Sequence, residues 1–244
     1  PGATVTGKSD AGAVYHFDLR TQDDDVSATR LGKVTTNTVG LGAGAQAGER
    51  VGEVLTVAGD GSVVHLGVPR RDVDGEEDAG AVVTVSAAYR DGHGGKPTYS
   101  ATLRTQNTKG VPDKAEAGDR FGAAIAAVND DRLAVGVPGE DVWKVKKKSL
   151  RGLSKKAKRK VVRKAQKAGT DVGAVQLFVM GRPLALATRT ARYQGLDVPG
   201  SNTRGDRFGA SLAYVQGLFC DGVGALGGSR RAERSYQASS AAPS

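Results

Sequence analysis

The stretch TTNTVGLGAGAQAGERVG (residues 35–52) decides the fold, because it recurs without a gap as TQNTKGVPDKAEAGDRFG (105–122). A third copy of its second half stands within VPGSNTRGDRFGASLAYV (198–215). The motif that follows it also recurs, as HLGVP (65–69) and AVGVP (134–138). Motifs that return in a fixed order indicate one supersecondary unit built several times.

Each unit also has a third motif, rich in the β-branched and aromatic residues that favour strands. Its copies are AGAVYHFDL (11–19), AGAVVTVSA (79–87) and VGAVQLFVM (172–180). An alternating run such as YSATLRTQ (99–106) follows, and Asp60-Gly61 supplies the residues of a tight hairpin turn. These patterns predict an all-β fold with about four short antiparallel strands in each unit.

A four-stranded sheet leaves two faces uncovered, and sheets that stack radially cover one another, as in a β-propeller. We therefore predict a partial β-propeller over residues 1–217, in which the glycines beside Phe121 and Phe208 allow neighbouring blades to approach closely. Residues 218–244 lose the pattern, and a disordered tail is expected there. The chain begins at Pro1, and the remaining blades are expected from a longer chain or another copy.

The repeated words carry a family resemblance. Phe-Gly and Gly-Val-Pro stand where the FG-GAP repeat of the integrin α-subunit head has Phe-Gly and Gly-Ala-Pro, although the first copy has Val51-Gly52 instead. The chain resembles this family over about residues 11–217, and it is similar to the integrin-like repeat proteins that bacteria secrete. The repeat-scaffold residues carried over from the family are Phe121, Gly122, Gly136, Pro138, Phe208 and Gly209.

The resemblance implies a secreted or cell-surface protein that works as a ligand-binding or adhesion module. Its partner would be a protein or a glycan of unknown identity. The alternative is a propeller that accompanies a secreted hydrolase or phospholipase. No nucleophile elbow, zinc-binding helix motif or phosphate-binding loop occurs in the sequence, so we expect the chain to be non-catalytic.

Calcium is the one cofactor that the resemblance raises, because family members bind it in a loop of alternating carboxylates. The equivalent loops of this chain supply too few carboxylates and suit hairpin turns. A separate acidic stretch has carboxylates at alternate positions, and either a calcium site or a solvated loop is consistent with it. The candidate ligands are Asp72, Asp74, Glu76 and Asp78.

A basic insertion interrupts the second complete unit. Residues 144–168 contain 13 Lys and Arg and no acidic residue, so the rest of a chain with net charge +9 is acidic. Apolar residues from Leu150 to Ala165 recur at near-helical spacing, Ser154 can cap a helix start, and Gly169 can end it. The pattern predicts a short basic amphipathic helix.

The cations of this insertion could contact a polyanion, either nucleic acid, anionic lipid or an acidic glycan; a solvated loop is the alternative. Trp143 is the only aromatic residue nearby, so base stacking is not expected. The candidate contacts are Lys146, Lys147, Lys148, Lys155, Lys156, Lys158, Arg159, Lys160, Arg163 and Lys164.

The remaining reactive residue types are few. Cys220 is the only cysteine, and His16, His65 and His93 are the only histidines, for which we expect structural or exposed roles. The tripeptide Arg-Gly-Asp at 204–206 overlaps the repeated word Gly-Asp-Arg-Phe-Gly, so we interpret it as part of the repeat. No run of 18 apolar residues occurs, so no transmembrane segment is expected.

Overall fold

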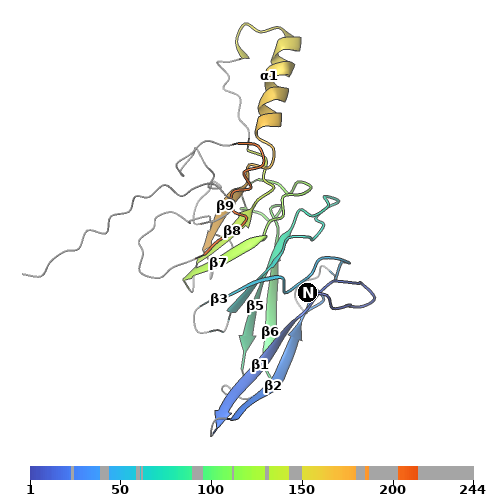
Figure 1. The fold of residues 1–244 in the computed structure, drawn as a ribbon, viewed down its shortest axis with the longest axis vertical. Coiled ribbons are helices and arrows are strands. Elements are labelled where there is room, and N and C mark those ends of the chain that lie inside the picture. The colour runs from blue at the N-terminus through green and yellow to red at the C-terminus, as the bar shows by residue number, and fades with distance from the viewer. Residues whose placement is uncertain are drawn as a thin grey trace, which may run out of the picture.

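A computed structural model describes residues 1–22, 25–38, 44–58, 61, 63–89, 96–111, 113–129, 132–142, 150–179, 185–186 and 203–213. The described chain is mostly β-sheet with one α-helix, and its strands form three antiparallel sheets (Figure 1). The predicted all-β class with one helical insertion is therefore confirmed. The predicted tail at 218–244, the calls on His93 and Cys220, and the cations Lys146–Lys148 lie outside the described residues.

Two of the sheets are four-stranded meanders in which every strand pairs with its sequence neighbour, as the repeat predicts. The second sheet contains β3 (Val54–Ala58), β4 (Val63–Val68), β5 (Ala81–Ala88) and β6 (Thr98–Arg104). The third contains β7 (Ala124–Asn129), β8 (Arg132–Val137), β9 (Ala174–Val179) and β10 (Ala185–Leu186).

The first sheet has two strands, β1 (Val14–Gln22) and β2 (Asp25–Val34). The bridge that Gly12 makes with Val51 matches the bridge that Gly80 makes with Phe121, so β1 and β2 correspond to β5 and β6. The first sheet therefore contains the last two strands of a unit. Within the described residues, no strand pairs with the other edge of β1.

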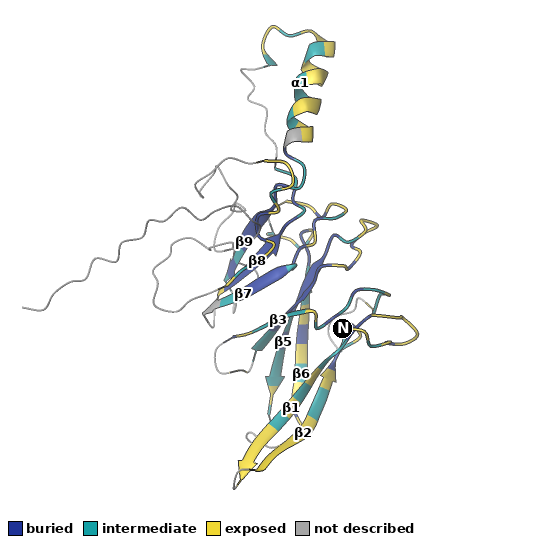
Figure 2. Ribbon diagram, viewed as in Figure 1, coloured by how far each residue is buried: buried dark blue, intermediate teal, exposed yellow. Residues whose placement is uncertain are grey.

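The hydrophobic core lies between the sheets, because β5 is apolar on both of its faces (Figure 2). Val83 and Val85 pack toward the first sheet, in a cluster that includes Val34 of β2. Val82 points the other way, into a cluster with Phe121 and with residues of the third sheet. Side chains of a strand alternate between faces, so one strand serves two cores.

The contacts between successive units repeat three times with the same hydrogen bonds. Amides of residues 48, 50 and 51 donate to carbonyls of residues 9, 10 and 11, and the same pattern joins 118–121 to 77–79 and 205–208 to 170–172. All nine N···O distances lie between 2.8 and 3.1 Å. Arg50, Arg120 and Arg207 each have a positive φ of 51–56° at these contacts. We call the contact around Gly12 and Val51 the first junction, and that around Gly80 and Phe121 the second.

The repeat-scaffold residues lie in the interior. Phe121 is fully buried, and Phe208 is buried at the equivalent position. A Cβ atom on Gly67 of β4 would collide with the carbonyl oxygen of Gly122, and one on Gly136 of β8 would collide with that of Gly209. Glycine at these positions therefore allows the close approach expected from the sequence.

Candidate functional site

The basic insertion forms α1 (Lys155–Ala168), which stands apart from the sheets at the top of Figure 1. Ser154 caps its start by accepting a hydrogen bond from the amide of Ala157 at 3.3 Å. The amide of Gly169 donates to the carbonyl of Ala165 and ends the helix. The predicted helix and both of its ends are thus confirmed.

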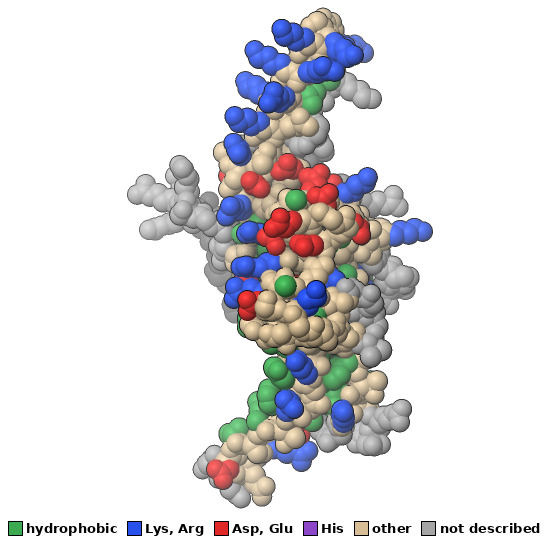
Figure 3. All heavy atoms as spheres, turned by 90° about the vertical axis from the view of Figure 1, so that its right-hand side faces the viewer, with side chains coloured by type: hydrophobic (Ala, Val, Ile, Leu, Met, Phe, Trp, Pro, Cys, Tyr) green, Lys and Arg blue, Asp and Glu red, His purple; other side chains and the backbone are tan. Residues whose placement is uncertain are grey.

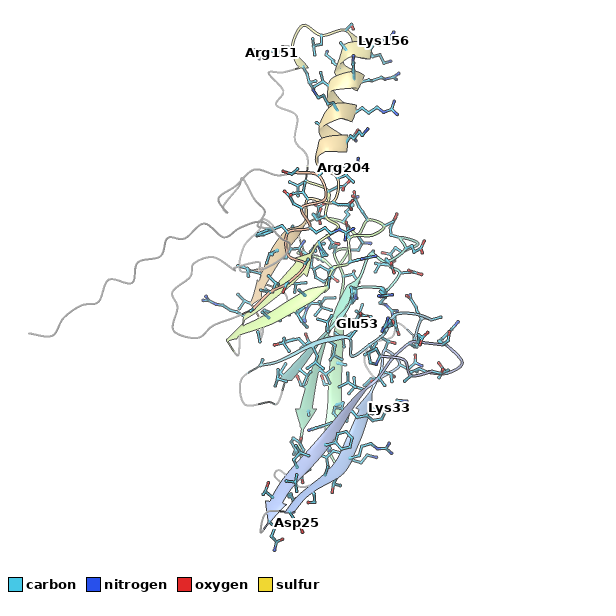
Figure 4. The ribbon with its side chains drawn as sticks, viewed as in Figure 1. Asp25, Lys33, Glu53, Arg151, Lys156 and Arg204 are labelled. Atoms are coloured by element: carbon cyan, nitrogen blue, oxygen red, sulfur yellow. The ribbon has the colours of Figure 1, made fainter. Side chains whose placement is uncertain are left out.

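The cations of α1 are exposed to solvent, whereas its apolar side chains are half-buried: Ala157, Val161, Val162 and Ala165. Figure 3 shows Lys and Arg side chains along the length of the projecting helix, and Figure 4 labels Lys156 at its outer end. Lys167, a further cation of the helix, is exposed. The described candidates are all exposed as well: Lys155, Lys156, Lys158, Arg159, Lys160, Arg163 and Lys164.

Like charges repel one another within α1, because the helix repeats cations at the spacing where side chains meet. Lys155 lies four residues before Arg159, and Arg159 lies four before Arg163. Such pairs destabilise a helix by a few tenths of a kcal/mol each. The first turn has no acidic residue to offset them. A bound polyanion would relieve this repulsion.

Hydrogen bonds from two backbone amides hold the base of the insertion. The amide of Val142 donates to the carbonyl of Gly169 at 2.8 Å, and the amide of Asp171 donates to the Asp141 carboxylate at 2.9 Å. The insertion therefore leaves and re-enters the sheet at one point, between β8 and β9.

The acidic stretch occupies the same place in the preceding unit, between β4 and β5. Asp74 and Gly75 have φ of 53° and 94°, and Val73 and Glu76 exchange two backbone hydrogen bonds around them, which makes a tight two-residue hairpin turn. Asp72 lies just before this turn and Asp78 just after it.

Three carboxylates in this stretch each interact with a different partner. Asp72 accepts from the amide of Asp78, Asp74 accepts from the Asn107 side chain at 2.7 Å, and Asp78 lies 3.9 Å from Arg120. Across the described residues, no group of three acidic, histidine or cysteine side chains is arranged to hold a metal ion. The calcium site at Asp72, Asp74, Glu76 and Asp78 stays a prediction.

A trio of buried polar side chains that the sequence analysis missed lies at the first junction. Glu49 is fully buried, forms an ion pair with Arg71 at 2.6 Å, and accepts a hydrogen bond from Thr36. We call these residues the Thr36 trio. The guanidinium of Arg71 also donates to the carbonyl of Gly44 at 3.1 Å.

The second junction has an equivalent trio, which consists of Gln106, Asp119 and Glu140 and which we call the Gln106 trio. All three are buried, and the amide of Gln106 donates to the Glu140 carboxyl at 2.7 Å. Alignment of the repeats places Thr36 on Gln106 and Glu49 on Asp119, so the equivalence of these positions was present in the sequence. Burial of charged side chains is uncommon, and the alignment alone did not reveal it.

The histidines play structural roles where they are described. Burial, with a contribution from Arg104, lowers the pKa of His65 to about 4, and its Nδ1 lies 3.0 Å from the Thr84 hydroxyl. The ring nitrogens of His16 lie 3.1 and 3.0 Å from the hydroxyls of Tyr99 and Tyr89.

The Arg-Gly-Asp tripeptide lies in a turn that the repeat explains. The Asp206 carboxylate accepts from the amide of Thr203 at 2.6 Å, and the Asp119 carboxylate accepts in the same way from the amide of Glu116 at 2.7 Å. Asp206 therefore performs the local role of its counterpart in the previous unit.

No protein-family model and no curated protein matches the chain. The one helix found in the described residues is too short and too polar to cross a membrane.

Proposed function

We propose that the chain is a non-catalytic binding module, built from FG-GAP type blades of a β-propeller, that works outside the cell or at its surface. The threefold recurrence of the junction hydrogen bonds is the observation that carries the proposal. It indicates that each unit is added to the last by the same operation, which is how a propeller is generated.

The burial of equivalent residues in successive sheets supports the stacking of blades. Ile125 of β7 is 7% exposed, because β3 of the preceding sheet packs against β7. Leu55 holds the same position in β3 and is 51% exposed, since the first sheet has no described strand at the place that β3 fills for β7. An apolar surface of this kind fits a sheet whose neighbour is incomplete.

Replacing Gly67 with alanine tests the stacking. The added methyl would press on the backbone of Gly122, which cannot move without separating the second and third sheets, so we expect a loss of about 2–3 kcal/mol in the free energy of unfolding. Urea unfolding followed by circular dichroism measures it. Gly136→Ala should behave alike, whereas Gly2→Ala, with one side-chain atom at 3.6 Å, should be near neutral. Equal stability of the three variants would exclude close-packed blades.

The ligand that the geometry supports best is an acidic glycan or similar polyanion held by α1. The helix carries a dense and exposed set of cations, and it projects where a large molecule can reach it (Figure 3). The described apolar side chains of the helix are alanines and valines, which offer less area for insertion into lipid than Leu, Phe or Trp: Ala157, Val161, Val162 and Ala165. Charge attraction is therefore its main means of binding.

We expect the variant Lys158→Gln/Arg159→Gln/Lys160→Gln to lower the salt dependence of heparin binding. Each cation that contacts a dense polyanion releases counterions, so the slope of log Kd against log salt should fall by roughly 2–3. Titration calorimetry at several salt concentrations gives the slope.

The matched control removes three exposed cations from the other end of the molecule, as Arg30→Gln/Lys33→Gln/Lys96→Gln. Figure 4 shows Lys33 on the β1–β2 hairpin, away from α1. Identical slopes for the two triple variants would show that α1 is not the binding surface. Equal binding of heparin and duplex DNA would show that charge alone selects the ligand.

A further inference from the structure

The Thr36 trio and the Gln106 trio occupy equivalent places but differ in charge at one corner. The carbonyl of Arg71 accepts from the amide of Gly80, and the carbonyl of Glu140 accepts from the amide of Gly173, both at 2.9 Å. The backbone thus places Arg71 and Glu140 alike. A guanidinium lies at the first junction where a carboxyl lies at the second.

This exchange leaves the second junction without the cation that the first one has. The first junction pairs Glu49 with Arg71, so its buried charges balance. The second buries Asp119 at 1% exposure and Glu140 at 3% exposure. Two buried carboxylates cannot both be ionised at moderate cost, because neither is solvated and each repels the other.

The surroundings of the Gln106 trio increase this cost, since the charged groups that act on it from neighbouring loops are acidic. Burial, followed by repulsion from Asp119 and Asp113 and a side-chain hydrogen bond with Asp113, raises the pKa of Glu140 to about 9, although the hydrogen bond from Gln106 opposes the change. Burial raises the pKa of Asp119 to about 7, although a hydrogen bond from the amide of Glu116 opposes the change. The acidic groups that face these two carboxyls or their neighbours are Glu76, Asp113, Glu116 and Asp141.

A second observation concerns the amide of Gln106, which is 1% exposed. Its nitrogen donates to Glu140, but its oxygen has no hydrogen-bond partner among the described residues. A protonated Glu140 can supply the missing donor through its O–H. A carboxylate can only accept hydrogen bonds and would leave this oxygen unsatisfied.

We propose that protonation of the two buried carboxyls, Asp119 and Glu140, takes the place of the Arg71 guanidinium at the second junction, so that the contact between the second and third sheets loosens when these carboxyls ionise. The first junction, with its internal cation, does not respond in this way. The base of the α1 insertion begins two residues after Glu140, at Val142, so ionisation of Glu140 should also loosen the base of the insertion.

The sign of the effect follows from the proton count. Both carboxyls have folded pKa values above their ordinary values, so the folded state binds more protons than the unfolded state between those limits. The free energy of unfolding therefore falls as the pH rises from about 4 through about 9. Below the ordinary values both states are fully protonated at these carboxyls, so the free energy of unfolding no longer changes with pH through them.

Carbon-13 NMR of the side-chain carboxyls in the full chain tests the proposal directly. We expect the Glu140 resonance to titrate with a midpoint above pH 7, against an ordinary value of 4.5. A midpoint below pH 6 would overturn the proposal. This measurement uses the unaltered protein, so it holds even if a variant fails to fold.

Thermal unfolding of variants provides the second test. We expect the wild-type melting temperature to fall by roughly 5 °C between about pH 6 and about pH 9. Glu140→Arg, which copies the first junction, should abolish the fall, and Glu140→Gln should reduce it. Asp25→Asn, at the exposed hairpin tip labelled in Figure 4, is the control and should keep the wild-type profile. The same fall in Glu140→Arg and wild type would contradict the proposal.

A metal ion could take the same place, and one further arm of the experiment separates it from a proton. Millimolar calcium chloride is added at about pH 9 to wild type and to Glu140→Gln. An unchanged wild-type melting temperature supports the proton. Restoration in wild type but not in Glu140→Gln would show that a metal fills the site, and the proposal would be rejected.

Discussion

Replacing Arg71 with methionine is expected to lower the free energy of unfolding by about 3–5 kcal/mol, because it leaves the Glu49 carboxylate buried without its cation. Methionine keeps most of the aliphatic volume, so the loss reports the charge rather than a cavity. Thr36 still donates to Glu49, but one neutral donor cannot replace the guanidinium. Urea unfolding at neutral pH measures the loss.

The double variant Arg71→Met/Glu49→Leu distinguishes a broken ion pair from a general loss of packing. Removal of both charges from a buried pair is often close to neutral, so the double variant should recover most of the stability that Arg71→Met loses. If the double variant is as unstable as the sum of the single ones, the pair is not the cause.

Replacing Phe121 with alanine is expected to cost about 3–5 kcal/mol as well, through a cavity between the second and third sheets. Its ring is fully buried and lies edge-to-face with that of Phe178 at a centroid distance of 6.0 Å. The cluster around it also contains Val82 of β5. The loss should appear both in the urea midpoint and in the melting temperature.

Phe17→Ala is the matched control, because it makes the same chemical change on β1 at a side chain that is 47% exposed. We expect it to cost less than about 1 kcal/mol. Equal losses for Phe17→Ala and Phe121→Ala would mean that Phe121 does not lie in a packed interface, and the arrangement of the sheets would be wrong.

The strands and the helix could be predicted because both depend on local patterns that the sequence displays. The alternation in YSATLRTQ predicts β6, and the spacing from Leu153 to Ala165 with Ser154 and Gly169 at its ends predicts α1. The close approach at Phe121 could be predicted as well, because its flanking glycine recurs with the repeat.

The trios could not be predicted from composition, because the identity of a charged residue does not indicate whether it is buried. Glu49 and Arg71 have ordinary sequence surroundings, and only the folded chain brings them to 2.6 Å across 22 positions. Arg71 and Glu140 are related by the repeat, yet their opposite charges conceal the equivalence. Likewise, nothing local in β1 indicates that its first edge has no described partner.

The insertion between β8 and β9 enters and leaves through neighbouring backbone atoms, with the amide of Val142 2.8 Å from the carbonyl of Gly169. The preceding unit closes the same opening with a hairpin turn of two residues, Asp74 and Gly75. The connection at this position can therefore be a two-residue turn or a whole helix without a change in the sheet that it joins. The strands on either side keep equivalent registers in the two units, with Val68 opposite Ala81 and Val137 opposite Ala174.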